Sequence, residues 1–161
     1  MAREMNKKER QLTDAQVKEL LMKGKTGTLS LNGDGGYPYS VPVNYVYLND
    51  AIYIHGANYG YKVDLIKADA KACFSCYVNV EILADKLTAA FESFIATGTA
   101  VMVEDRDEKQ AVLDHIVDQL STPEFKEKGS KMIAAMIDKT GIIKFNIEEI
   151  TGKAYDNARW A

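Results

Sequence analysis

The chain has 161 residues and a mass of 17.9 kDa, so we expect residues 1–161 to form a single domain. Its apolar content of 47% and charged content of 27% are typical of a globular protein. The net charge of −3, without a basic stripe, disfavours nucleic acid as a partner. We expect no membrane partner, since the longest apolar run, residues 132–137, is too short to span a bilayer. Two cysteines and a polar start without a secretory signal favour a cytoplasmic protein.

The first predicted element is a helix after Thr13. Residues 13–16 have the pattern of a capping box, an apolar face follows, and Gly24 is a stop signal. Beyond Gly24 the apolar residues alternate, which is typical of strands. The elements expected next are a strand around residues 29–31, a hairpin turn at 32–36, a long strand over 37–48, a turn at 49–50 and a short strand over 51–55.

The second half of the chain also alternates between strand and helix patterns. Its expected elements are a loop over residues 56–60, a short helix over 61–68, a strand over 72–80, an ambiguous stretch over 81–90, a strand over 91–103 bent at Gly98, helices over 107–120 and 131–138, and a final strand around 143–148. About six strands, mostly joined as hairpins and flanked by short helices, predict a mainly β, antiparallel barrel or sandwich.

Two features that could suggest a metal or redox site have simpler interpretations. Cys73 and Cys76 form a C-x-x-C pattern, but residues three apart on a strand point to opposite faces, and there is no second pair to complete a metal site. We interpret both as buried thiols. His115 lies near the border of the apolar face of its helix, which indicates a partly exposed histidine. No metal site is expected.

The segment from Pro38 to Tyr47 is the first candidate for a binding site. Pro42 lies inside a long strand pattern and removes one backbone donor, so it indicates an edge strand or a bulge. A planar heterocycle with its own donors and acceptors could satisfy the backbone groups left without a strand partner. The alternative is an edge strand that proline protects from aggregation, and the segment alone does not decide between the two.

The second candidate runs from His55 to Lys62, as a strand end, a loop of small residues and a helix start. The glycines at 56 and 60 permit close backbone approach, and the positive end of the helix dipole attracts anions. Lys62 is unfavourable in the first helical turn unless an anion lies nearby. The pattern therefore indicates a phosphate site. An exposed lysine in a tight turn is the alternative.

With these segments in order, the sequence resembles the pyridoxamine-phosphate-oxidase-like flavoprotein superfamily and, within it, the nitroimidazole-resistance branch. The resemblance runs from residue 9 to residue 152. The stretches that carry it are residues 36–39, 41–45, 52–57 and 60–66, followed by Ser93 and residues 97–100.

The resemblance implies a six-stranded antiparallel split β-barrel that forms a homodimer, with FMN at the subunit interface. It places the strand over residues 41–45 along the isoalloxazine ring and the residues from 55 to 62 at the ribityl-phosphate end. The cofactor-binding residues implied in this way are Val41, Pro42, Val43, Asn44, His55, Gly56, Ala57, Lys62 and Ser93. Ser93 matches a position that carries a flavin-contacting glutamine in the oxidase.

Two departures argue against pyridoxamine-phosphate oxidase activity itself. The family's Arg-Lys pair is Tyr61-Lys62 here, and the arginine-rich C-terminal segment has no counterpart in residues 153–161, which leaves open a contact from Trp160. The resemblance then implies an FMN-dependent reductase of a small acceptor, for example a nitro-aromatic one, in which the flavin carries the chemistry and no catalytic side chain is assigned. The alternatives are a flavin- or heme-binding carrier or sensor without turnover, and an oligomerising structural domain.

Overall fold

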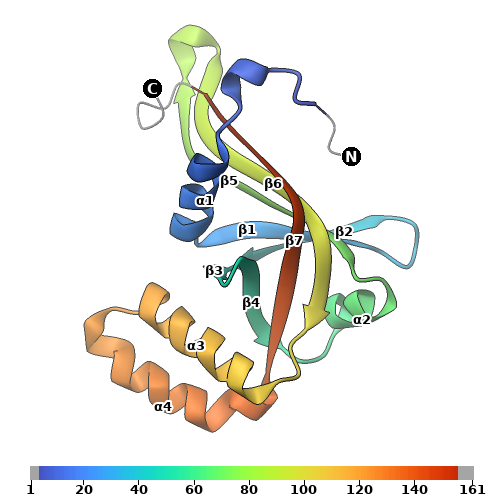
Figure 1. The fold of residues 1–161 in the computed structure, drawn as a ribbon, viewed down its shortest axis with the longest axis vertical. Coiled ribbons are helices and arrows are strands. Elements are labelled where there is room, and N and C mark those ends of the chain that lie inside the picture. The colour runs from blue at the N-terminus through green and yellow to red at the C-terminus, as the bar shows by residue number, and fades with distance from the viewer. Residues whose placement is uncertain (1–3, 156–161) are drawn as a thin grey trace.

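The computed structural model describes residues 4–155, which form one antiparallel sheet of seven strands in the order β2-β1-β5-β6-β7-β4-β3 (Figure 1). The strands are β1 (Thr26–Asn32), β2 (Pro38–Asn44), β3 (Val46–Leu48), β4 (Ala51–Ala57), β5 (Lys71–Leu83), β6 (Thr88–Met102) and β7 (Thr140–Tyr155). The helices are α1 (Asp14–Lys23), α2 (Tyr61–Ala68), α3 (Arg106–Leu120) and α4 (Lys126–Met136), with short 3-10 turns at Lys8–Arg10, Ala84–Lys86, Pro123–Phe125 and Ile137–Lys139.

The sheet closes on itself because its two edge strands are adjacent in the sequence. β2 pairs with β1 and β3 pairs with β4, yet only Tyr45 separates β2 from β3. The sheet must therefore curl until these edges meet, which gives the expected split barrel. The prediction of one long strand over residues 37–48 was wrong, and this break raises the strand count from six to seven. Tyr45 is buried, and its hydroxyl donates to the backbone oxygen of Leu21.

Irregularities in pairing shape the long strands β5, β6 and β7. The β6–β7 register shifts between Thr97 and Gly98, as the predicted bend requires. A Cβ on Gly98 would overlap the backbone oxygen of Asn146, so only glycine permits this close approach. A second shift follows Val78 in β5, where Asn79 has a positive φ of 53°. Beyond it Val80 is 46% exposed instead of continuing the buried face.

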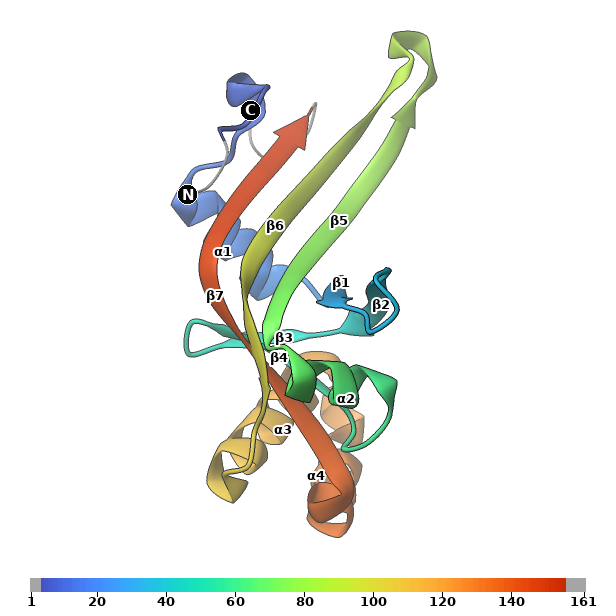
Figure 2. The same cartoon turned by 90° about the vertical axis from the view of Figure 1, so that its right-hand side faces the viewer.

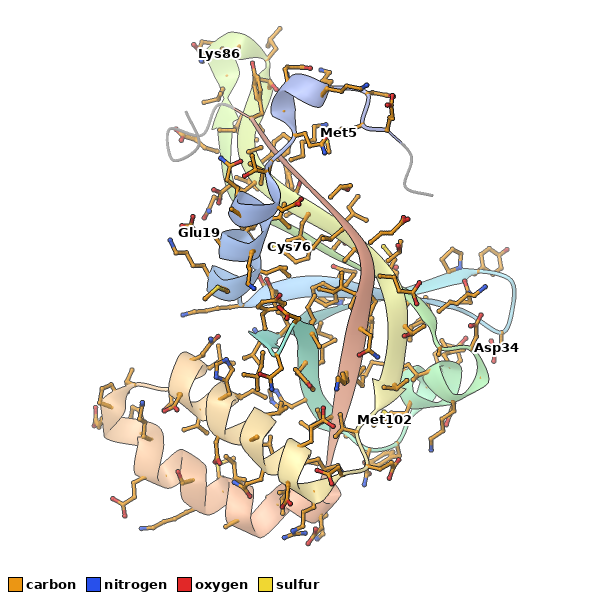
Figure 3. The ribbon with its side chains drawn as sticks, viewed as in Figure 1. Met5, Glu19, Asp34, Cys76, Lys86 and Met102 are labelled. Atoms are coloured by element: carbon orange, nitrogen blue, oxygen red, sulfur yellow. The ribbon has the colours of Figure 1, made fainter. Side chains whose placement is uncertain are left out.

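The ambiguous stretch over residues 81–90 is the end of a long hairpin. β5 and β6 extend past the rest of the sheet and are joined by the turn that contains Lys86 (Figure 2, Figure 3). Its side chains include exposed apolar ones, such as Ile82 at 74% and Leu87 at 94% exposure. This arm therefore presents apolar surface that the described part of the chain does not cover.

Two clusters of buried side chains fill the interior. The larger lies inside the barrel between α1, α2 and the sheet, and its aromatic centre consists of Tyr45, Phe74, Phe94 and Phe145. The smaller lies beneath α3 and α4 and consists of Val46, Ala51, Tyr53, Val103, Val112, Leu113, Ile133, Ile137 and Ile142. The chain passes from one cluster to the other at the break between β2 and β3.

The helices follow the predicted signals closely at their starts. Thr13 and Gln16 form the capping box of α1, α1 ends at Gly24, and α2 has the predicted bounds. Only the last predicted helix differs, because α4 begins at Lys126 instead of near residue 131. None of the helices over residues 4–155 is long and apolar enough to cross a membrane.

Candidate functional site

Edge strand β2 carries the first group of predicted site residues. Val41 and Val43 are half-buried against the barrel core, whereas Ser40, Pro42 and Asn44 are exposed on the outer face of the sheet. The Oγ atoms of Ser30 and Ser40 lie 2.8 Å apart, which places these side chains on the same outer face. Pro42 thus lies on an edge strand, as predicted, with its ring exposed.

Asn44 has a structural contact within the chain. Its Nδ2 donates to the backbone oxygen of Lys25 over 3.3 Å, and the next backbone N–H, of Tyr45, donates to the same oxygen over 3.0 Å. These bonds hold the end of β2 against the start of β1. The Asn44 side chain therefore helps to form the sheet break, a role that sequence alone did not indicate.

Lys62 and Gly56 form the second group, at the start of α2. The Lys62 Nζ lies 3.8 Å from the position that a Cβ on Gly56 would occupy, so the ammonium lies over the backbone of β4. Gly60 caps the helix with a φ of 107°, and none of the described side chains caps this end. The first-turn N–H groups and the Lys62 ammonium therefore create a local positive potential that suits a phosphate.

The two groups are neighbours because the β1–β2 hairpin packs on α2. The Tyr61 hydroxyl donates to Asp34 Oδ1 over 2.7 Å, and the Tyr39 and Tyr61 rings meet edge to face with centroids 5.1 Å apart. Asp34 lies at the hairpin turn beside α2 (Figure 3). β2 is thereby held against the helix that carries Lys62. Sequence reasoning missed this clamp, since it joins residues that are 22 to 27 positions apart.

His55 points away from the Lys62 side of β4. Ile54 and Gly56 face the side on which Lys62 lies, so alternation places His55 on the opposite face, where it lines a cavity beside α3 and α4. Burial, and then the positive charge of Lys62, hold the pKa of His55 below its usual 6.5. The imidazole is thus neutral at pH 7. His55 and Lys62, both predicted at the phosphate end, thus lie on opposite faces of β4, close enough for the Lys62 charge to act on the imidazole.

Ser93 lies far from both groups within one chain. It pairs with Lys153 of β7, whereas His55 pairs with Ile142, so the two are eleven residues apart along β7, or roughly 35 Å. Ser93 shares the outer face with Pro42, three strands away and so about 14 Å distant. Its Oγ donates to the backbone oxygen of Lys153 over 3.3 Å. Within one chain, Ser93 therefore does not adjoin the other predicted site residues.

The outer face of the sheet also contains a cavity of about 400 Å³, which the sequence did not predict. It is lined by Ser30, Leu31, Asn32, Pro38, Lys71, Ala72, Cys73, Thr97, Gly98, Thr99 and Glu148. Cys73 is half-buried there and Cys76 is buried on the opposite face, so the two thiols diverge as predicted. Burial, with the nearby Glu92 charge, raises the pKa of Cys76 to about 11, so this thiol is protonated and unreactive.

The described residues define only part of any site. Ala57 ends β4 with its backbone packed against Gly141, where a Cβ would lie 2.6 Å from the Ala57 oxygen. Residues 4–155 hold no group of three His, Cys, Asp or Glu side chains that could bind a metal ion. Trp160 lies outside the described residues, and so does most of the C-terminal segment compared with the oxidase.

Comparison with known proteins supports the resemblance seen in the sequence. The family model described as pyridoxamine 5'-phosphate oxidase matches residues 13–154, and the chain belongs to this family. No curated protein sequence matches the chain.

Several solved structures share the fold. A proposed 5-nitroimidazole antibiotic resistance protein from Bacteroides thetaiotaomicron is 19% identical, with a TM-score of 0.73 over 89% of this chain and 86% of that one. A conserved hypothetical protein from Mycobacterium tuberculosis is 16% identical, with a TM-score of 0.77 over 94% and 90%. An FAD- and heme-binding protein from Mycobacterium smegmatis is 18% identical, with a TM-score of 0.72 over 92% and 74%.

Proposed function

We propose that this protein is an FMN-dependent oxidoreductase that reduces a small acceptor, such as a nitro-aromatic compound, with FMN held between two copies of the chain. The observation that carries the proposal is the Lys62 ammonium over the Gly56 backbone at the open end of α2. The clamp between Tyr39 and Tyr61 keeps this anion site beside edge strand β2. Family membership and the flavin named for the Mycobacterium smegmatis structure support it.

The residues present fit a flavin phosphate. Gly56 leaves open the space beside the ammonium that a larger side chain would fill, and Lys62 supplies a positive charge there. The backbone of β2 around Val41, Pro42 and Val43 offers donors and acceptors along an exposed edge. When bound, FMN supplies one- and two-electron transfer to an acceptor on its ring. The protein binds and orients, and we assign no side chain as acid or base.

The position of Ser93 supports a dimeric site. In one chain Ser93 lies about 14 Å from β2 along the outer face, so we expect it to contact the flavin of a second copy. Ile95 and Tyr77, exposed by 55% and 59%, add apolar surface to this face. Their contact across a homodimer would remove that surface from water.

A flavin- or heme-binding carrier without turnover is the second candidate. It is favoured by the similarity to a structure that binds both FAD and heme. His55 is the histidine nearest to this site in the sequence, but its ring faces α3 and α4.

The absorbance of the purified protein separates these candidates. Oxidised flavin bands indicate a flavoprotein, whereas a Soret band indicates heme. The flavin is then reduced without oxygen and mixed with nitro-aromatic, quinone and oxygen acceptors. Fast reoxidation by one class supports the reductase, and reoxidation by none at rates above free FMN supports the carrier. A colourless protein that takes up neither cofactor contradicts both.

A further inference from the structure

The cavity between α3 and α4 is separate from the proposed flavin site. It has a volume of about 180 Å³ and lies on the His55 side of β4, opposite the Lys62 ammonium. Its lining consists of His55, Leu113, Ile116, Val117, Gly129, Met132, Ile133, Met136 and Thr140. An apolar cavity of about 150 Å³ is large enough for benzene, so this one accommodates a single ring with a small substituent.

Helices α3 and α4 approach closely at Gly129. A Cβ on Gly129 would lie 2.9 Å from both methyl carbons of Val117, so the helices touch at this glycine. Glycine inside a helix costs about 1 kcal/mol relative to alanine, and here the close contact accounts for its presence. Beyond the contact, aliphatic side chains form the walls.

The rim of the cavity consists of flexible apolar side chains. Met132 and Met136 are 61% and 48% exposed, although both belong to an otherwise apolar lining. Thioether sulfurs make favourable contacts with aromatic rings, and the unbranched side chain adapts to the shape of a ligand. Exposed methionines around a preformed cavity therefore favour an aromatic occupant.

Two polar groups remain available at the mouth. Thr140 Oγ1 donates to the backbone oxygen of Met136 over 3.0 Å, so its lone pairs can still accept a hydrogen bond. The His55 ring makes no hydrogen bond to another residue between 4 and 155, and being neutral it offers one donor and one acceptor. No Lys, Arg, Asp or Glu lines the cavity within the described part of the chain, so a ligand of either charge would be poorly stabilised.

We propose that the α3–α4 cavity binds an uncharged monocyclic aromatic or heteroaromatic molecule with one hydrogen-bonding substituent directed at His55 and Thr140. The cavity lies on the face of β4 opposite the Lys62 ammonium, so its occupant would not fill the space of the flavin phosphate. An effector or a second substrate of this chemical class would occupy it.

NMR of the methionine methyl groups tests the proposal in flavin-free protein. Phenol, benzene and benzoate are titrated while the methyl signals of Met132, Met136 and Met22 are followed; Met22 is exposed on α1 and is the internal control. We expect phenol to shift only the Met132 and Met136 signals, with saturation near ~1 mM. Benzene should bind roughly three- to tenfold more weakly, because it lacks the hydrogen bond, and benzoate should not bind.

Variants identify the site. Thr140→Val should bring phenol down to the affinity of benzene, whereas Lys67→Ala, at an exposed position in the last turn of α2, should leave both affinities unchanged. Ile116→Phe should abolish binding by filling the cavity; if it does not fold, Met132→Phe at the exposed rim should weaken binding in the same way. Equal shifts of all three methionines, or binding of benzoate as tightly as phenol, would overturn the proposal. So would Met132 and Met136 signals that change with protein concentration alone, which would indicate a contact between copies.

Discussion

Lys62 is the residue on which the proposed cofactor site most depends. Replacing it by alanine should weaken FMN binding about tenfold to a hundredfold, because a charge-assisted contact contributes roughly 1.5–3 kcal/mol. Riboflavin, which lacks the phosphate, should be nearly unaffected. Fluorescence titration of both ligands measures the difference.

Lys67→Ala is the matched control, since Lys67 is exposed in the last turn of the same helix. It should bind both ligands as the unchanged protein does. Equal losses of FMN and riboflavin in Lys62→Ala would contradict a phosphate contact.

Pro42 lies on an edge strand with its ring exposed, so its removal leaves no buried cavity. We expect Pro42→Ala to change unfolding free energy by about 0.5 kcal/mol or less and to shift the flavin reduction potential. Asn44→Ala should lower the unfolding free energy more than Pro42→Ala, because it loses the bond to the Lys25 oxygen. It should leave the flavin reduction potential unchanged, because no flavin contact is predicted through the Asn44 side chain. Circular dichroism and a redox titration measure both effects. A Pro42→Ala protein without a folded spectrum would show that the proline is purely structural.

At the scale of the elements, the close pairing of β6 with β7 at their register shift depends on Gly98. A Cβ there would overlap the backbone oxygen of Asn146, so Gly98→Ala should cost roughly 2–3 kcal/mol of unfolding free energy in a urea titration. Gly35→Ala is the control, because a Cβ at that position would have no atom within 4 Å. It should be neutral or slightly stabilising. If Gly98→Ala were as stable as Gly35→Ala, the backbone at the register shift would tolerate a side chain and the prediction would be wrong.

The Glu108 carboxylate links helix α3 to the sheet, in addition to the buried apolar side chains of the helix. Glu108 Oε1 accepts from Lys144 Nζ over 2.9 Å and from the Tyr53 hydroxyl over 2.8 Å. These contacts, the Lys144 bond first, lower the pKa of Glu108 below its usual 4.5. A lowered pKa means that the ionised carboxylate stabilises the folded state, and that this contribution disappears as pH falls through the folded-state pKa.

Glu108→Gln should therefore lower the unfolding free energy by about 1 kcal/mol at pH 7. The difference from the unchanged protein should shrink below about pH 4.5. Asp107→Asn, at the neighbouring exposed position, should change stability by less than about 0.5 kcal/mol. Chemical denaturation from pH 7 to pH 3 measures both. A difference that grows toward low pH would contradict this role for Glu108.

At the scale of the whole molecule, a site shared by two chains couples cofactor binding to assembly. We expect sedimentation to give twice 17.9 kDa, and dilution to release FMN in parallel with dissociation. Ile95→Lys on the outer face should shift the protein toward monomer and release FMN, whereas Met22→Lys on α1 should not. A monomer that keeps stoichiometric FMN at nanomolar concentration would contradict the shared site.

Seven of the nine tyrosines fall within residues 37–61, and tyrosine is common at protein interfaces, but the structure buries some of them and exposes others. Tyr45 and Tyr53 are buried in the two cores, Tyr39 and Tyr47 are half-buried, and only Tyr37, Tyr59 and Tyr61 are exposed. The dimer stays a prediction, and we expect its contacts at the exposed apolar side chains of the outer face and the β5–β6 arm.

Short sequence patterns by themselves determined several helix ends and one strand bend of this protein. The capping box at Thr13, the stop at Gly24, the bounds of α2 and the bend at Gly98 were all predicted correctly, because each depends on the backbone chemistry of a few adjacent residues. The divergence of Cys73 and Cys76 followed from strand alternation alone.

Only the tertiary structure decided what depends on contacts between distant residues. Alternation continues through Tyr45, so no local pattern showed that the chain leaves one sheet edge there and joins the other. For the same reason the sequence alone could not show how the predicted site residues lie relative to one another. Alternation places His55 and Lys62 on opposite faces of β4, and the pairing partners of His55 and Ser93 are eleven residues apart along β7. Residue spacing determines which face of an element a side chain occupies, but the packing of whole elements determines which faces meet.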